Sequence, residues 1–195
     1  AEKNPNTHRA AVRALIEASA WADQPANRKE VVRIISAKSY VNAPTDVVDN
    51  SMTGTWRYSK EEKLVSLPDF NVFHRYAANF PWRSHASWFI TQMYRWGQLE
   101  KPVDIRKTAS SIYLPDTYRQ AAKELGIAAP TIDWKEEGLH SGAWTLTQAT
   151  APITMGPDLF FDGMKYNPAK LMDYLKGFKV TNFKVDLNQL AKLNK

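Results

Sequence analysis

The sequence predicts a helix-rich chain with few short strands, and three observations support this prediction. Apolar residues recur at helical spacing over most of the 195 residues. Gly and Pro stand mostly between these periodic stretches, where they begin or end helices. Strict alternation of apolar and polar residues, which is typical of strands, occurs only in short pieces. Sheet partners for those pieces are therefore expected to lie outside this chain.

Three helices are expected in the N-terminal quarter. The first covers residues 8–22, with Thr7 as its N-cap, and its apolar side chains spread around more than half of its circumference. We therefore expect this helix to be packed on several sides as part of the core. The second covers residues 28–38 after Asn27, and a short third helix has Pro44 in its first turn.

The middle of the chain predicts extended pieces followed by one strong helix. Residues 51–73 lose the helical period and predict short extended pieces, at 53–58 and 70–73, around a charged turn. The strongest helical pattern follows at residues 84–97, where Ser84 is the expected N-cap. We expect this helix to bury one face, formed by Trp88, Phe89, Met93 and Trp96.

The C-terminal half predicts shorter elements. Helices are expected at residues 103–113 and 115–125, and the Gly, Pro, Ser and Thr content of residues 127–154 predicts loops with one short strand. Residues 159–166 have an Asp-Gly turn between apolar flanks, which is a hairpin pattern. A helix follows at residues 167–176, and a short Leu/Lys helix ends the chain. No stretch is rich enough in Gly or Ser to predict a linker between two domains.

Composition excludes several classes of protein. The 44% hydrophobic and 24% charged residues are ordinary for a globular protein and rule out a disordered chain. Because cysteine is absent, disulfides, thiolate nucleophiles and cysteine zinc sites are excluded. No run approaches the about 18 apolar residues of a membrane span. The opening AEKNPNT is polar and lacks an initiator Met, so we expect processing or a start within a longer protein.

Sequence motifs give no support for an enzyme. His8, His74, His85 and His140 are scattered, and no Gly-x-Ser-x-Gly elbow accompanies them. Neither a Gly-x-Gly-x-x-Gly loop nor a P-loop is present, and no ligands are spaced for zinc or calcium. We therefore predict a protein without catalytic residues, whose histidines make local hydrogen bonds.

Several segments together are similar to one family of proteins. The run PWRSHASWFITQMYRWG at residues 81–97 resembles the periplasmic nitrate- and bicarbonate-binding proteins of ABC transporters. The resemblance covers most of residues 4–178. Shorter pieces agree with the family in the same order: NPNT at 4–7, ALIEA at 14–18, PANR at 25–28, YVNAP at 40–44 and FFDG at 160–163.

The resemblance implies an α/β fold overall, like the type II periplasmic-binding proteins, with two lobes around an anion cleft. Residues 1–195 would then be the C-terminal segment of such a protein, helix-rich with few short strands, and the N-terminal part would be absent. The implied function is the extracytoplasmic substrate-binding component of an ABC transporter for nitrate or a related anion: nitrite, cyanate or bicarbonate. Such a protein delivers its anion to a permease in the inner membrane, and is periplasmic or anchored on the outer face of that membrane.

One residue is a candidate for the ligand site. In the bicarbonate binders a carboxylate in this region helps to hold a calcium ion beside the anion, and Glu17 lies near the corresponding place. The resemblance therefore implies that Glu17 is both a ligand-binding residue and a metal ligand, and that calcium is a cofactor if the anion is bicarbonate. The alternative is a surface ion pair with Arg13, four residues earlier on the same helix.

Two other functions stay open. Domains similar to this family also act as nitrate sensors or are fused to the ATPase subunit of the transporters, where they regulate. The net charge of +6 also allows a basic nucleic-acid-binding module. The basic residues do not concentrate, however, and the lysine-rich residues 165–195 include interspersed Asp, so nucleic acid is not the expected partner.

Overall fold

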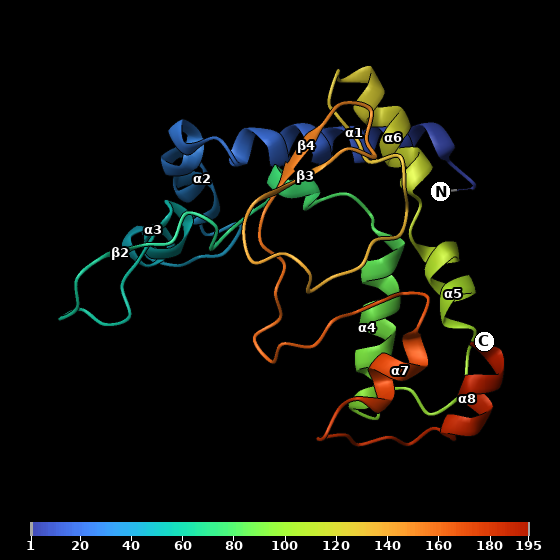
Figure 1. Cartoon of the computed structure of the whole chain (residues 1–195). Helices are drawn as coiled ribbons and strands as arrows, with labels where there is room; N and C mark the ends of the chain where they lie inside the picture. The colour runs from blue at the N-terminus through green and yellow to red at the C-terminus, as the bar shows by residue number, and fades with distance from the viewer. Residues whose placement is uncertain (1, 195) are drawn as a thin grey trace. The chain divides into compact units, whose positions relative to one another are not determined.

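The computed structural model describes residues 2–194 and confirms the helix-rich architecture with few short strands (Figure 1). These residues divide into two compact units, unit 1 up to Asn79 and unit 2 from Phe80. The sequence does not mark this division, because the residues around it are aromatic and proline-containing and not a Gly/Ser linker. Within residues 2–194, no helix combines the length and the apolar character that crossing a bilayer requires.

Unit 1 begins with helices α1 (Pro5–Ala22), α2 (Arg28–Ile35) and α3 (Thr45–Met52), with a short 3-10 helix η1 (Pro25–Asn27) before α2. All three expected helices are present. The N-cap of α1 was expected at Thr7, which is wrong: the helix starts three residues earlier because proline suits the first helical turn, where no N–H is needed.

The expectation that the first helix is packed on several sides is also wrong. Only Ile16 of α1 is buried, whereas Leu15 is 67% exposed and Trp21 is 39% exposed. Apolar composition predicted burial all round, but the described residues cover only one side of the helix.

A small hairpin follows α3. Strands β1 (Thr55–Trp56) and β2 (Val65–Ser66) pair antiparallel, which confirms extended pieces around the charged turn. The second extended piece was expected at residues 70–73, but strand β2 lies earlier in the chain. Phe70 is not part of a strand; its ring stacks on Trp56, with ring centroids 4.4 Å apart. The hairpin is therefore held by an aromatic pair as well as by its few backbone bonds.

Over residues 80–194, unit 2 contains five helices: α4 (Arg83–Arg95), α5 (Ile105–Ile112), α6 (Pro115–Glu124), α7 (Leu171–Lys176) and α8 (Leu187–Leu193). Each was expected, with ends that differ by up to four residues. Helices α4 and α5 pack together, and the core around them holds side chains from α7 and α8. The fully buried members of this core include Tyr94, Ile105, Tyr166, Leu175 and Leu190.

Helix α4 buries a different face from the one expected. Of the four predicted core residues only Trp88 packs against the core, while Phe89, Met93 and Trp96 are 53%, 37% and 48% exposed. Ser84 is buried inside the helix and is not its N-cap, which is Trp82. The buried face holds both small and large residues: Ser84, Ala86, Ser87, Ile90, Thr91 and Tyr94.

The segment between α6 and α7 contains two short strands where one was expected. Strands β3 (Trp144–Leu146) and β4 (Ile153–Met155) pair antiparallel. The hairpin expected at 159–166 is wrong, although its turn is present: the N–H of Gly163 donates to the carbonyl of Phe160. The flanks of this turn do not pair with each other, because Tyr166 pairs with Glu137 in an antiparallel bridge.

Candidate functional site

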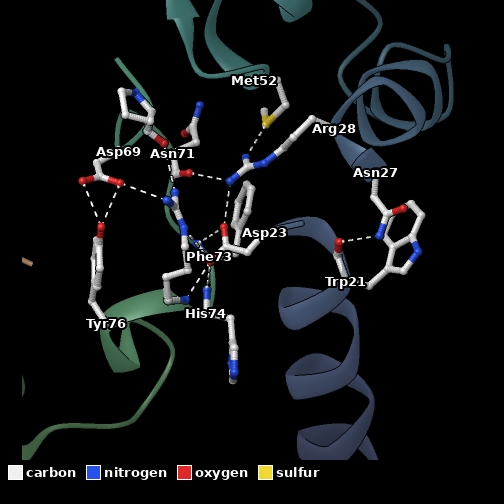
Figure 2. A network of polar contacts seen from close by, with 12 residues as sticks. Trp21, Asp23, Asn27, Arg28, Met52, Asp69, Asn71, Phe73, His74 and Tyr76 are labelled. Carbon is white, nitrogen blue, oxygen red and sulfur yellow. Dashed lines mark hydrogen bonds and ion pairs between the residues drawn. The ribbon is translucent and has the colours of Figure 1, made fainter. Parts of the chain in front are cut away.

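Unit 1 contains a network of polar contacts around a buried carboxylate at the end of α1 (Figure 2). Asp23 is 6% exposed, and one of its oxygens lies 2.7 Å from Nη2 of Arg28. The same carboxylate accepts the backbone N–H groups of Phe73, at 3.0 Å, His74, at 2.6 Å, and Arg75, at 2.7 Å. Four donors therefore converge on one charge, which is what a buried carboxylate requires.

The surroundings keep Asp23 ionised. Burial alone raises the pKa of its carboxyl group, but the backbone N–H groups of Arg75, His74 and Phe73 and the charge of Arg75 together outweigh burial. The net result is a lowered pKa. With its acceptor positions filled by these donors, this carboxylate is a structural anchor rather than an acid, a base or a metal ligand.

Arg28 extends the network to two further segments. Its Nη2 also donates to the carbonyl of Asn71 at 2.8 Å, and its Nη1 lies 3.7 Å from the sulfur of Met52 at the end of α3. The side chain of Asn71 in turn donates to the carbonyl of Ser51 at 2.8 Å. The Asp23–Arg28 pair thus ties the end of α1, the start of α2, the end of α3 and the loop 71–75 together.

The same loop contains strained backbone. Tyr76 and Ala77 have φ values of 61° and 51°, in the left-handed region that non-glycine residues seldom adopt. The hydroxyl of Tyr76 donates to the carboxylate of Asp69 at 3.2 Å, and Arg75 pairs with Asp69 at 3.0 Å. These contacts and the Asp23 network hold the strained turn in place.

The predicted site residue, Glu17, lies on α1 six residues before Asp23. Its side chain is 56% exposed, and its Oε2 lies 3.9 Å from Nε of Arg13. This is the geometry of the surface ion pair that the sequence offered as the alternative. No group of three or more His, Asp or Glu that could hold a metal occurs in the part of the chain that the structure describes. Glu17 would supply only one of the about six to eight oxygens that calcium takes, so the role of Glu17 stays a prediction.

Unit 2 holds two ion-pair networks around α4. Asp133 accepts from Arg83 at 2.6 Å and also from Arg119. Glu137, 8% exposed, pairs with Nε2 of His85 at 2.9 Å and with Lys135. Each carboxylate is matched by cations or donors on more than one side, so these networks serve to fix the segment 133–137 against α4.

Three of the four histidines make local polar contacts, as expected. Besides His85, the Nδ1 of His74 lies 3.3 Å from the side chain of Asn79, and the Nδ1 of His140 lies 2.8 Å from Asp158. The ring of His140 stacks on Trp144 with centroids 4.1 Å apart. None of these contacts brings a serine or threonine hydroxyl to an imidazole, so they do not form a nucleophile–histidine–acid arrangement.

Sequence reasoning missed Asp23 and Arg28. They are five residues apart, a spacing that is not the three or four of a helical ion pair, and the other partners of Asp23 are about fifty residues away in the chain. The only local signal was the segment PANR, which ends on Arg28 and is one of the pieces that resemble the binding-protein family.

Comparisons with known proteins give matches over nearly the whole chain. The sequence model of the NMT1-like family matches residues 1–36. The nitrate/nitrite binding protein NrtA of Nostoc sp. is 29% identical over 180 residues, which are 92% of this chain and 37% of that protein. The bicarbonate-binding protein CmpA of Synechococcus elongatus is 28% identical over 187 residues, 92% of this chain and 38% of that protein.

A third kind of relative is an ATPase subunit. The nitrate import ATP-binding protein NrtC of Synechocystis sp. is 27% identical over 179 residues, 91% of this chain but 23% of that protein. The chain therefore spans well under half the length of the curated relatives that it matches.

A solved structure supports the fold. The crystal structure of the periplasmic nitrate-binding protein NrtA from Synechocystis PCC 6803 matches with a TM-score of 0.73 and 23% identity, covering 92% of this chain and 42% of that one. The expected likeness to a periplasmic binding protein, helix-rich in this segment, is confirmed. The resemblance to the nitrate- and bicarbonate-binding proteins is confirmed as well, since sequence and structure comparisons agree on it.

Proposed function

We propose that this chain is the C-terminal segment of a two-lobed, extracytoplasmic binding protein that supplies an ABC transporter with nitrate or a related small anion. The observation that carries the proposal is the likeness to NrtA over 92% of the chain in both sequence and fold. Nitrite, cyanate and bicarbonate are the other anions of the proposal, and CmpA supports bicarbonate in particular. The protein would be periplasmic or anchored on the outer face of the inner membrane.

In this proposal the protein binds and does not catalyse. The anion is held between two lobes, the lobes close around it, and the closed protein hands the anion to the permease. The net charge of +6 favours the approach of an anion. The role of this chain is to provide a rigid part of one lobe, and the buried Asp23–Arg28 pair supports that role by joining four segments of unit 1.

Glu17 is the residue of this chain that the proposal places near the ligand. An exposed carboxylate repels a bare anion, so a cation has to lie between them. Calcium suits this purpose if the ligand is bicarbonate, because it prefers oxygen ligands and can be shared between a carboxylate and the anion. The proposal therefore links Glu17 to bicarbonate with calcium and not to nitrate.

Thermal unfolding of the complete protein tests the proposal. A ligand that binds only the folded state raises the melting temperature, and the stabilisation grows with the logarithm of one plus the ratio of ligand concentration to Kd. Nitrate, nitrite, cyanate and bicarbonate are compared with chloride at equal ionic strength, and bicarbonate is tested with and without calcium. We expect one of the four to raise the melting temperature; four unchanged melting temperatures would contradict the proposal.

A second candidate is a regulatory domain of the transporter's ATPase subunit. The observation that favours it is the similarity to NrtC, which covers 91% of this chain. Such a domain would sense nitrate and adjust transport instead of carrying the anion. The sequence that adjoins this chain in its complete protein distinguishes the two, because an ATPase subunit contains the P-loop that this chain lacks.

A further inference from the structure

Unit 2 contains a pocket that has no part in the anion binding proposed above. It has a volume of about 360 Å³ and lies where α5 meets the segment before α7 and the end of α8. Figure 1 shows α8 beside the start of α5, and the N–H of Ile105 donates to Oδ1 of Asn194 at 2.8 Å. The pocket is formed within unit 2 alone, whereas Glu17 belongs to unit 1.

The main polar feature of the pocket is a guanidinium group in a fixed position. The Cζ atom of Arg106 lies over the ring of Trp134, 4.1 Å from its centroid. Nη1 of Arg106 donates to the carbonyl of Pro168 at 2.9 Å. Stacking and one hydrogen bond hold this otherwise mobile side chain, so its entropy is lost before any ligand binds.

The rest of the guanidinium is available to a ligand. Its Nε and Nη2 make no hydrogen bond to any other residue within 2–194, although both are strong donors. A guanidinium that is stacked on an aromatic ring presents its edge, and that edge matches the two oxygens of a carboxylate. The fixed position of Arg106 therefore favours a planar, two-oxygen anion.

Two further polar side chains line the same pocket from α5. Ser110 lies one turn after Arg106 on the same face of the helix, and Lys107 adds a second cation. Asp104 also lines the pocket, and its carboxylate accepts the N–H of Lys107 at 2.9 Å as the helix N-cap. With two cations and one carboxylate, the lining keeps a net positive charge.

The remaining lining combines polar and apolar side chains, among them Asn194, Leu193 and Trp134. Leu193 and Ala169 are exposed apolar residues, whereas Pro168 and Leu171 are buried and one face of Trp134 is covered by Arg106. The volume of about 360 Å³ falls within the range of roughly 300–1,000 Å³ that is usual for small-molecule sites. An inorganic anion of four atoms would leave most of this volume empty. A carboxylate that carries a short apolar group fills more of it and meets Leu193 and Ala169.

We propose that this pocket binds a small organic carboxylate, with the carboxylate on Arg106 and Ser110 and its short apolar group against Leu193 and Ala169. The site is separate from the inorganic-anion site of the proposed function. It gives the protein a second ligand of a different chemical class.

Calorimetric titration of the complete protein with benzoate and with isovalerate tests this proposal. We expect saturable binding of at least one of the two, and binding of the matching uncharged amide, benzamide or isovaleramide, that is at least about tenfold weaker, because the amide lacks the charge that Arg106 pairs with. Arg106→Gln is expected to weaken carboxylate binding by at least about tenfold. Arg106→Lys keeps the charge but loses the two-pronged edge, and is expected to give an intermediate affinity.

The matched control is Arg57→Gln, which removes the same charge from an exposed position in unit 1. It is expected to leave carboxylate binding unchanged, which separates a local effect from a change in net charge. Circular dichroism shows whether each variant is folded, and Arg106→Lys keeps the test valid if Arg106→Gln unfolds. Absence of binding of both carboxylates through the millimolar range, equal binding of the amide, or unchanged affinity in a folded Arg106 variant would each overturn the proposal.

Discussion

Replacing Asp23 by Asn removes one charge from the buried network while keeping the size of the side chain. In the native protein the carboxylate accepts one hydrogen bond from Arg28 and three from backbone N–H groups. The amide oxygen of Asn accepts two bonds at most, and its NH₂ group is itself a donor that faces other donors. At least two of the four bonds are therefore lost, and Arg28, which is 6% exposed, becomes a buried charge without a counter-ion.

The expected cost follows from those losses. Removing one partner of a buried ion pair costs about 3–5 kcal/mol, and a hydrogen bond to a charged group contributes about 1.5–3 kcal/mol. The two figures describe overlapping effects, so we expect a total of about 3–5 kcal/mol. Because the stability of a domain is about 5–15 kcal/mol, Asp23→Asn should remove a large part of the stability of unit 1.

Hydrogen exchange of individual amides is the appropriate assay, because it reports the free energy of local opening inside the complete protein. The amides of Phe73, His74 and Arg75 donate to Asp23 and should lose the most protection in Asp23→Asn. Asp49→Asn is the matched control, since Asp49 pairs at the surface with Lys29, whose side chain is 76% exposed; its cost should be about 0–1 kcal/mol. A loss below about 1 kcal/mol in Asp23→Asn would mean that the Asp23–Arg28 pair does not anchor the loop.

Three further predictions follow from the structure. The pKa of Asp23 is lowered in the folded protein, so the stability that ionised Asp23 gives the fold is complete above the ordinary pKa of 3.8 and is lost as the pH falls through the lower folded pKa. Hydrogen exchange of the Phe73 amide, corrected for intrinsic rates, should show this loss of stability at acid pH in the native protein and not in Asp23→Asn. Glu17→Gln should change the free energy of unfolding by less than about 0.5 kcal/mol while abolishing any calcium dependence of bicarbonate binding, and an unaltered calcium dependence in calorimetry would remove Glu17 from the ligand site. Gly138→Ala should destabilise unit 2 by about 1–3 kcal/mol in denaturant unfolding, because Gly138 has φ +82° and an added Cβ would lie 2.6 Å from the carbonyl oxygen of Met164. Gly126→Ala is the control: Gly126 has φ +66° but open space around it, so the substitution should cost less. Equal costs for the two substitutions would contradict the steric argument.

The helices could be predicted from the sequence because their signals are local. Apolar spacing and Pro or Gly at the ends depend on neighbouring residues, and all eight expected helices are present in residues 2–194. The boundaries were less accurate. α1 starts at Pro5 and not after Thr7, since a proline in the first turn and a polar N-cap are competing signals for the same helix start.

Which face of a helix is buried could not be predicted in the same way. In α4 both the stripe with Phe89 and Met93 and the stripe with Ala86, Ile90 and Thr91 follow the helical period. The choice between them depends on which elements pack against the helix, and that is a property of the tertiary structure. The stripe with Phe89 and Met93 was predicted to be buried because its side chains have the larger apolar area, and that prediction was wrong.

The polar networks were beyond prediction for a related reason. Asp23 meets the N–H groups of residues 73–75, and Arg106 meets Trp134 and Pro168, at separations that no local pattern encodes. Glu17 became a candidate only through the resemblance to a family, and the structure places it on the exposed side of α1 beside Arg13. The sequence therefore indicated the family that the chain resembles more securely than it indicated the residues of the polar networks and of the ligand site.

Isothermal titration calorimetry of the complete protein with nitrate shows whether it binds a small inorganic anion, with nitrite, cyanate and bicarbonate plus calcium as parallel titrations. We expect saturable binding of one anion to a single site, at an affinity that the Arg106 variants leave unchanged. Heats no larger than dilution for all four anions would contradict the assignment of this chain to an anion-binding transport protein.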